Sequence, residues 1–267
     1  MATIAETRRQ TLDIGAVVRG TFAPLGRNPA TFFGLSFLLA GLPRALLSWM
    51  QMGLGFGPAG AFGAAAISTP GKVLAFFVVG LGVWALGGVL QAAMIYGVVE
   101  DLNGRRPTLG ACLSTGLRFA LPVIAISWLF GFAVGCGLVL LIVPGLMLMT
   151  RWAVSIPAEV IERTGVFRAF ARSRDLVRGS RWAIFALLVA LAIAAFAVQM
   201  TFGALLGGVM MANPNPLAGI RASAPIIGAL AGTFIGPVGA AGVASIYVEL
   251  RTLKEGAEPA SLAAVFD

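Results

Sequence analysis

Carboxylates and arginines meet in one stretch of the chain, from Glu159 to Arg181. Glu159, Glu162 and Asp175 are its acidic residues, and a pair of carboxylates can serve as general acid and general base. Neighbouring arginines explain the same carboxylates adequately as ion-pair partners. The chain contains no histidine, so the commonest general base and the commonest nitrogen ligand of zinc are both missing. We therefore expect no catalytic residue, no metal site and no cofactor.

The same stretch carries six arginines in a pattern that favours an amphipathic helix within residues 163–181. Apolar or small residues recur at positions 166, 169, 170, 173 and 177, which is the spacing of one helix face. A basic helix of this kind lies along a membrane surface, where an anionic leaflet stabilises each nearby arginine by about 1 kcal/mol. The arginines expected to contact lipid are Arg168, Arg172, Arg174, Arg178 and Arg181. The alternative is ordinary positive-inside topology, which needs no lipid recognition.

Composition indicates that membrane helices position this stretch. Of the 267 residues, 58% are hydrophobic and 11% are charged, whereas soluble domains contain about 25% charged residues. The net charge of +8 would suggest nucleic acid for a soluble protein. Here most basic residues lie beside apolar segments, so we expect membrane lipids, anionic ones in particular, and no nucleic acid as partners.

Hydropathy predicts an all-α polytopic transmembrane bundle of about six spans, since one span needs about 20 apolar residues. The predicted spans are about 29–49, 73–99, a third from near Leu117, a fourth ending near Glu162, 182–211 and 225–249. The third and fourth spans reverse either at Gly135–Gly137 or at Pro144-Gly145. We favour the first position, with Pro144 kinking the fourth helix. The Gly- and Ala-rich segment 52–69 is either an external loop or a re-entrant segment.

Three parts of the chain follow from this pattern. Residues 1–28 form a cytoplasmic segment in which Ile14, Val18, Phe22 and Leu25 have helical spacing, so an interfacial amphipathic helix is expected. The alternative is a cap packed on the bundle. Residues 29–250 form the membrane domain, and residues 251–267 form a cytoplasmic tail.

The basic residues indicate which side of the membrane each loop occupies. Those assigned to the inner side are Arg8, Arg9, Arg19, Arg27, Arg105, Arg106, Arg118, the six arginines of residues 163–181, Arg251 and Lys254. Only Lys72 and Arg221 fall in predicted outer loops. The positive-inside rule then places both termini in the cytoplasm, in a multi-pass protein of the cytoplasmic membrane.

Charged residues within or beside the predicted spans need partners, because an unpaired charge in the bilayer costs at least a few kcal/mol. The candidates are Arg44, Arg151, Glu159 and Glu249. Arg44 is close enough to the end of its span to reach the headgroups, and a substrate site is the alternative. Glu159, Glu249 and backbone carbonyls are possible partners for Arg151, which has either a structural or a transport role.

Small residues predict where helices approach one another closely. Gly203 and Gly207 are four residues apart in the fifth span, as are Gly228, Gly232 and Gly236 in the sixth. Packing within one bundle is favoured over dimerisation. The two cysteines, Cys112 and Cys136, are expected on opposite sides of the membrane, so no disulfide joins them.

Two sequence motifs carry a resemblance to a known family. They are PGLMLMTRWAVSIPAEVIERTGVFRAFARSRDLVRGSRW from Pro144 and YVELRTLKEG from Tyr247. Together they resemble a bacterial six-helix integral membrane family, typified by the membrane domain attached to some glycerophosphoryl diester phosphodiesterases. The resemblance covers the second half well and the first half only in hydropathy. It implies a membrane bundle, and phosphodiesterase activity is not carried over because no catalytic domain is recognised.

The function expected from these features is that of a non-enzymatic, homo-oligomeric protein of the bacterial inner membrane. It would organise the membrane or interact with lipid through its one-sided charge and amphipathic segments. The alternative is a channel or transporter for an unknown solute or lipid, suggested by Arg44, Arg151 and the proline-interrupted helices. Against it, the sequence has no detectable inverted repeat and few polar residues to line a path.

Overall fold

The computed structural model describes residues 12–53, 70–212 and 215–256. All regular elements in these ranges are helices, which confirms the all-α part of the predicted fold class. Five helical segments are long and apolar enough to cross a membrane. They are Pro29–Met50, Pro70–Leu102, Ala120–Leu140, Arg181–Ala212 and Ser223–Glu255. The segment 54–69 and the predicted tail beyond residue 256 lie outside the described residues.

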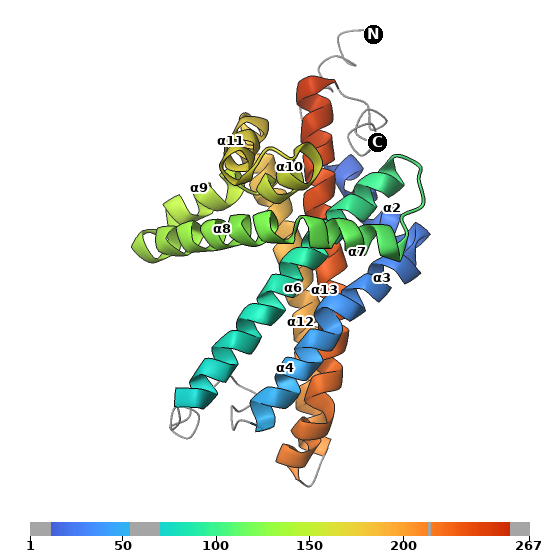
Figure 1. The fold of residues 1–267 in the computed structure, drawn as a ribbon, viewed down its shortest axis with the longest axis vertical. Coiled ribbons are helices and arrows are strands. Elements are labelled where there is room, and N and C mark those ends of the chain that lie inside the picture. The colour runs from blue at the N-terminus through green and yellow to red at the C-terminus, as the bar shows by residue number, and fades with distance from the viewer. Residues whose placement is uncertain (1–11, 54–69, 213–214, 257–267) are drawn as a thin grey trace.

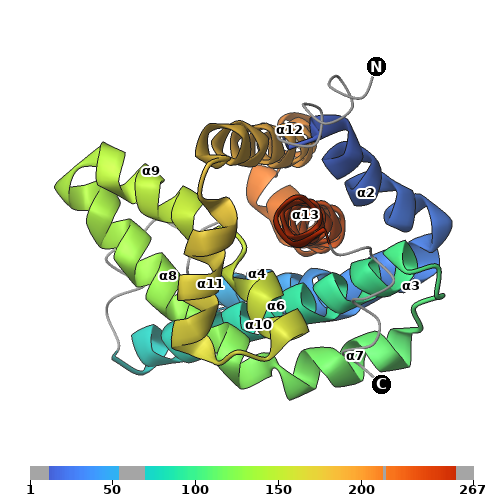
Figure 2. The ribbon, with the colours of Figure 1, turned by 90° about the horizontal axis from the view of Figure 1, so that it is seen from above.

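The longest helix, α13 (Pro216–Glu255), stands in the middle of the molecule (Figures 1 and 2). α12 (Arg181–Ala212) runs beside it, and α6 (Pro70–Leu102) packs on another side at a tilt. Ala240, Ala241 and Ala244 are buried on α13 and allow neighbouring backbones to approach. The core therefore surrounds the C-terminal half of α13, and the spans toward its other end expose apolar side chains.

The first crossing is one continuous path of three helical segments. These are α3 (Pro29–Ser36), the π-helical turn η1 (Phe37–Gly41) and α4 (Leu42–Gly53). Pro29 begins α3, where a missing N–H costs no helical hydrogen bond. Pro43 follows η1 and has no N–H to donate, and at this point the Leu42 N–H bonds to the Phe37 carbonyl, five residues back. A wider turn of this kind accommodates a proline without ending the helix.

The N-terminal amphipathic segment forms α2 (Ile14–Arg27), which packs against α13. The Asp13 carboxylate caps it by accepting a hydrogen bond from the Ala16 N–H at 3.2 Å. Ile14, Val18 and Phe22 are exposed, whereas Leu25, predicted on the same face, is buried. α2 therefore packs on the bundle and also presents an apolar stripe outward.

The predicted fourth span does not form. α8 (Ala120–Leu140) ends at Leu141, whose extended backbone reverses the chain into α9 (Ile142–Arg151). The favoured reversal at Gly135–Gly137 is wrong, and Pro144 lies in the first turn of α9 instead of kinking a span. A proline is tolerated there because the first N–H groups of a helix have no partner within it. At ten residues, α9 is about 15 Å long, too short to cross a bilayer.

The α8–α9 hairpin is closed by two glycines. A Cβ on Gly145 would lie 2.5 Å from Leu138 Cγ and 2.7 Å from Leu138 N, and a Cβ on Gly137 would lie 2.9 Å from Gly145 Cα. Side chains at either position would push the helices apart. In both ribbon views the hairpin lies across the direction of α13 (Figures 1 and 2).

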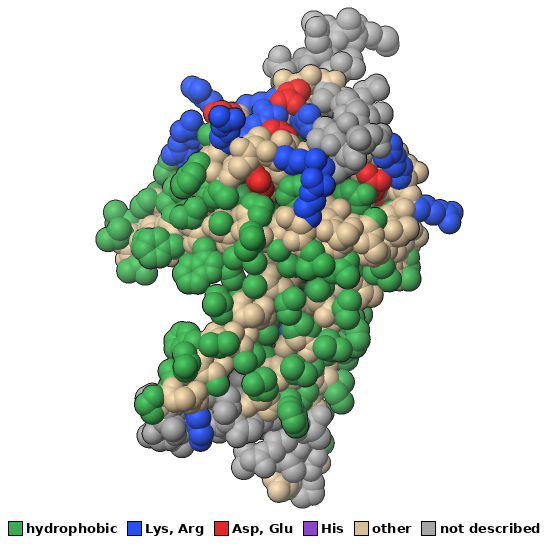
Figure 3. Space-filling model, in the orientation of Figure 1, with side chains coloured by type: hydrophobic (Ala, Val, Ile, Leu, Met, Phe, Trp, Pro, Cys, Tyr) green, Lys and Arg blue, Asp and Glu red, His purple; other side chains and the backbone are tan. Residues whose placement is uncertain are grey.

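Three short helices complete one end of the molecule, namely α7 (Leu109–Arg118), α10 (Ser155–Glu162) and α11 (Val166–Val177). Arg163 and Gly165 adopt positive φ, which turns the chain sharply between α10 and α11. α11 is the predicted basic helix, with Ala169, Ser173 and Val177 buried as expected. Charged side chains gather at this end in Figure 3. We call it the charged end, and the end with Gly53 and Pro70 the far end.

The five glycines predicted to mediate helix packing fall into two groups. Gly232 faces Ala40 and Arg44 of the first crossing, and Gly236 faces Ser36 and Leu90, at distances where a Cβ would be tight. Among the described residues, no neighbouring atom lies within 4 Å of a Cβ position on Gly203, Gly207 or Gly228. Of the predicted glycines, only Gly232 and Gly236 therefore mediate close helix packing within one chain.

Candidate functional site: a polar network at the charged end

The helices α10 and α11 are held together by contacts that do not involve α13. Ser173 of α11 lies between two backbone groups, accepting from the Val154 N–H at 3.3 Å and donating to the Arg151 carbonyl at 3.0 Å. The rings of Trp152 and Phe170 pack with centroids 4.8 Å apart. The C-terminal end of α9 therefore forms one unit with the helices α10 and α11.

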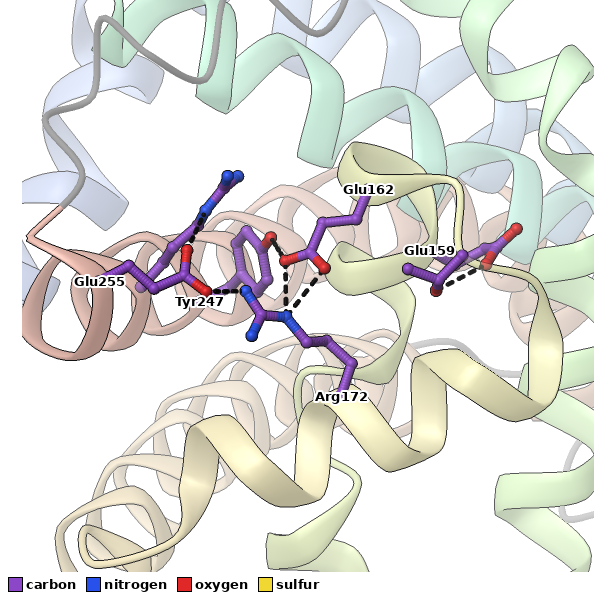
Figure 4. A network of polar contacts seen from close by, with 7 residues as sticks. Glu159, Glu162, Arg172, Tyr247 and Glu255 are labelled. Atoms are coloured by element: carbon purple, nitrogen blue, oxygen red, sulfur yellow. Dashed lines mark hydrogen bonds and ion pairs between the residues drawn. The ribbon is translucent and has the colours of Figure 1, made fainter.

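Arg172 joins this unit to α13 through two carboxylates (Figure 4). Its Nε donates to both oxygens of Glu162, at 2.9 and 2.8 Å, and its Nη2 donates to Glu255. The hydroxyl of Tyr247, a fully buried residue, donates to Glu162 Oε1 at 2.6 Å. One arginine thus connects α11, α10 and α13, although these residues are far apart in the sequence.

The last turns of α13 add further contacts to the same network. Arg251 Nε donates to Glu255 Oε2 at 2.9 Å. Lys254 Nζ donates to the carbonyls of Asp175 and Arg178, at 2.9 and 2.6 Å. A cation at the C-terminus of α11 satisfies carbonyls that have no helical partner. α13 therefore continues through the predicted boundary at residue 250 and uses its final residues to hold α11.

Electrostatics favour the charged state of Arg172. Burial alone lowers the pKa of its guanidinium, but the hydrogen bonds to Glu255 and Glu162 outweigh burial and raise the pKa. Its positive charge is therefore paired with carboxylates of the protein itself. Of the five arginines predicted to contact lipid, Arg172 is the one whose ion pairs join different helices and whose side chain is largely buried.

The other four predicted lipid-contacting arginines, Arg168, Arg174, Arg178 and Arg181, are exposed. Two large aromatic side chains next to them are exposed as well: Phe167 by 80% and Trp182 by 85%. The sequence analysis did not single out these aromatics. Phe167 and Trp182 are next to Arg168 and Arg181 in the sequence, and this adjacency could have identified them, because aromatic and basic residues together mark the membrane interface.

Glu159 and Arg151 do not form the pair considered from the sequence. Glu159 is 5% exposed on α10, and the Thr164 hydroxyl donates to its Oε2 at 3.5 Å. Burial raises the pKa of the Glu159 carboxyl, and hydrogen bonds from Gly165 and Thr164 oppose this only in part. The Arg151 Nε is buried and has no hydrogen-bond partner in the part of the chain that the structure describes. Arg151 ends the short helix α9 beneath α11, so it does not lie in the middle of a span.

The remaining predicted intramembrane charges lie apart from the network. Arg44 is on α4, where its Cδ would be 3.0 Å from a Cβ on Gly232. Glu249 of α13 faces α2, where the Asp13 backbone N–H bonds to it. The structure therefore does not bring Arg44, Arg151, Glu159 and Glu249 together into one site.

One buried carboxylate, that of Asp101, was not predicted from the sequence. Asp101, at the end of α6, accepts from Arg27 Nε at 3.0 Å and from Asn28 Nδ2 at 2.7 Å, and its side chain is 5% exposed. Hydropathy placed Asp101 in a polar turn and gave no sign of burial. Its partners lie more than seventy positions earlier in the chain, and no local pattern predicts such a contact.

The cysteines do not form a reactive pair. Both are free, with Cys112 buried on α7 and Cys136 exposed on α8. Burial raises the pKa of the Cys112 thiol to about 12, with a smaller contribution from Glu100. Cys112 is therefore an inert packing residue at neutral pH.

In chemical terms the network is a set of ion pairs that joins helices. Within the described ranges, no three His, Cys, Asp or Glu side chains lie close enough to hold a metal ion. Comparison with protein families, curated proteins and solved structures finds no match. The resemblance to the six-helix membrane family stays a prediction.

Proposed function

We propose that this protein is a non-enzymatic, multi-pass membrane protein that binds an anionic leaflet through α11 and organises the lipid around it. The observation that carries this proposal is the outer surface of α11. Arg168, Arg174 and Arg178 are exposed there, and exposed Phe167 and Trp182 flank them. Arginines attract anionic headgroups, and aromatic rings prefer the headgroup level of a bilayer.

The architecture supports a one-sided action on the bilayer. The charged end carries short helices around α13, whereas the described residues at the far end belong to the long candidate spans (Figure 1). A protein that is broader in one leaflet than in the other favours lipid packing, or a curvature, that matches its shape. We place the charged end in the cytoplasm of a bacterium, because positive charge is retained on that side.

Vesicles of defined composition test this proposal. The protein is reconstituted into neutral vesicles and into vesicles containing phosphatidylglycerol, and the lipids retained after gentle detergent extraction are quantified. We expect enrichment of the anionic lipid and a salt-dependent shift in vesicle size, because screening weakens charge attraction at a membrane surface. Each exposed arginine replaced by glutamine removes about 1 kcal/mol of attraction.

A matched pair of variants separates the role of α11 from net charge. The triple variant Arg168→Gln, Arg174→Gln, Arg178→Gln is compared with Arg105→Gln, Arg106→Gln, Arg118→Gln, which loses the same charge elsewhere. We expect only the first to lose the enrichment. Equal losses of enrichment in both variants would mean that overall charge, and not α11, attracts the anionic lipid. Unchanged enrichment in the α11 variant would refute the proposal.

The alternative function, transport, is measured in the same vesicles. A broad panel of solutes is tested for flux, with Arg44→Ala as the variant that removes the charge beside Gly232. Flux that depends on Arg44 would replace our proposal. Native mass spectrometry of the same samples measures whether the protein is a homo-oligomer, as we propose.

A further inference from the structure

We propose that the α8–α9 hairpin does not cross the membrane but enters and leaves a single leaflet from the charged end. The surface concerned is the tip of the hairpin, residues 139–143, and its partner is the acyl-chain region of that leaflet. This inference concerns topology and is independent of the proposed function. It leaves four crossings of the five candidate spans, because α8 is removed from the set.

The direction of the hairpin is the first observation. α6, α12 and α13 run between the charged end and the far end, whereas α8 and α9 lie across α13 in both views (Figures 1 and 2). α8 is about 31 Å long, which would suffice to cross a bilayer if it stood upright. Lying across α13, it ends at the level at which it begins.

The height of the hairpin follows from its contacts with α6. A Cβ on Gly116 would lie 2.7 Å from the Val89 carbonyl oxygen, and a Cβ on Gly88 would lie 3.4 Å from Ile124. The junction of α7 and α8 therefore sits near Val89, at most about 25 Å along α6 from Lys72. Since Lys72 belongs to the far end and the hydrocarbon core is about 30 Å thick, the junction lies in the leaflet nearer the charged end.

The chemistry of the tip identifies its surroundings. Val139, Leu140, Leu141, Ile142 and Val143 are each 67–88% exposed, and no polar side chain interrupts them. A turn in water is rich in Gly, Asn, Asp and Ser, each of which satisfies or relaxes the turn backbone. Five adjacent exposed aliphatic residues instead match hydrocarbon. The tip is continuous with the apolar surface of the spans below the charged end (Figure 3).

The backbone of the tip sets the depth. Only Leu141 leaves helical geometry, and its N–H still bonds to the Gly137 carbonyl at 3.0 Å. Pro144 contributes no N–H, so one fewer donor lacks a partner in the first turn of α9. The few polar groups that remain disfavour the bilayer centre, where unsatisfied backbone is excluded, and favour a shallow position near the headgroups.

Polar groups lie on the side of the hairpin toward the charged end. Arg151 ends α9, and its carbonyl accepts the hydrogen bond from Ser173 of α11. α11 therefore rests on the base of the hairpin and presents its exposed arginines above it. Apolar tip and basic helix then occupy neighbouring depths of one leaflet, hydrocarbon and headgroup.

Site-specific cysteine labelling tests the inference. In a Cys136→Ser background, Leu141→Cys places a thiol at the exposed tip, where no packing is disturbed. Lys72→Cys reports the far side, and Arg106→Cys reports the charged side. A membrane-impermeant maleimide is applied to intact vesicles of each orientation and again after detergent is added. We expect Leu141→Cys to react only in detergent, whereas each control reacts from its own side.

A second measurement distinguishes lipid from protein as the cover of the tip. A bimane fluorophore on Leu141→Cys, attached before reconstitution, is quenched by lipids that carry a nitroxide at different depths of the acyl chain. We expect stronger quenching by a shallow nitroxide than by one near the bilayer centre. Labelling of Leu141→Cys together with Lys72→Cys would mean that α8 crosses the membrane. Labelling together with Arg106→Cys, or protection without quenching, would equally overturn the inference, because the tip would then lie in water or under another protein.

Wild-type protein provides an independent check that needs no substitution at the tip. Cys136 is exposed on α8, and Cys112 is buried. We expect the impermeant maleimide to leave both unmodified in intact vesicles. After detergent is added, the reagent should modify Cys136 alone, because only then does water reach that thiol and allow the reactive thiolate to form. Modification of Cys136 by the impermeant reagent from the far side would contradict a single-leaflet hairpin.

Discussion

Arg172 and Arg174 are two positions apart on α11, yet they have different roles. Arg172 is bound by Glu162 and Glu255, whereas the Arg174 side chain is 52% exposed and lies 3.7 Å from Asp175, which is 65% exposed. An exposed pair of that kind contributes little, because water and salt screen it. Both arginines were predicted to contact lipid, and the difference between them arises from the position of α13.

Replacing each of these arginines by glutamine should therefore have unequal effects. Arg172→Gln leaves Glu162 without its cation and removes one of the two arginines that bond to Glu255, so we expect a loss of about 1.5–3 kcal/mol, the usual range for hydrogen bonds to charged groups. Arg174→Gln should leave stability unchanged. Thermal unfolding of both variants in detergent measures the difference. If both variants unfolded at the wild-type temperature, the network would not hold the helices together.

Glu159 should make stability depend on pH in the direction opposite to that of an ordinary ion-paired carboxylate. Its pKa is raised in the folded protein, mainly by burial. The folded state therefore binds its proton more tightly, and stability is lost as pH rises from the unfolded pKa, about 4.3, through the folded pKa. Glu159→Gln mimics the protonated side chain and should be free of this loss.

The measurement is the unfolding temperature of wild type and Glu159→Gln across this pH range. The advantage of the variant should grow as pH rises and then level off. Asp175→Asn, at an exposed carboxylate on the neighbouring helix, is the control for the loss of one negative charge. A variant that was less stable than wild type at neutral pH would show that the charged form of Glu159 is the stabilising one.

At the scale of elements, the hairpin shows why two of its glycines differ in their importance for helix packing. Gly145 faces Leu138 in the contact between α8 and α9, whereas Gly135 on α8 has no neighbour within 4 Å of a Cβ position. Both were read from the sequence as possible reversal points. Only the packing of α9 on α8 distinguishes a glycine that permits contact from one that faces outward.

Alanine substitutions at these two glycines should separate the two roles. Gly145→Ala forces the Leu138 backbone away from α9, and we expect a loss of about 1–3 kcal/mol, typical of overpacking. Gly135→Ala adds a methyl group to open space and should be neutral or slightly stabilising, since alanine favours the helix. Limited proteolysis and thermal unfolding in detergent report both effects. Equal behaviour of the two variants would mean that α8 and α9 are not in close contact.

At the scale of the whole molecule, one end is built by polar contacts and the other by apolar helices. Arg172, Lys254 and the Arg27–Asp101 pair all join distant segments at the charged end. Toward the far end, α12 and α6 expose much of their apolar surface. Such an arrangement fits a bilayer that solvates one part and a water-facing surface that needs internal pairing. It agrees with the coarse prediction of a membrane protein with one-sided charge.

The sequence by itself determined the helical class, most crossing segments and the amphipathic character of α11, because hydropathy and helical periodicity are local properties. It did not determine the direction of α8. Hydropathy records which residues avoid water, and an upright helix and a helix lying across the bundle satisfy it equally. The break at Leu141, the contact of Gly145 with Leu138 and the packing of Gly116 on Val89 decided that direction. Likewise, the bond from Arg172 to Glu255 and the link from Arg172 to Tyr247 through Glu162 exist only because α13 packs beside α10 and α11.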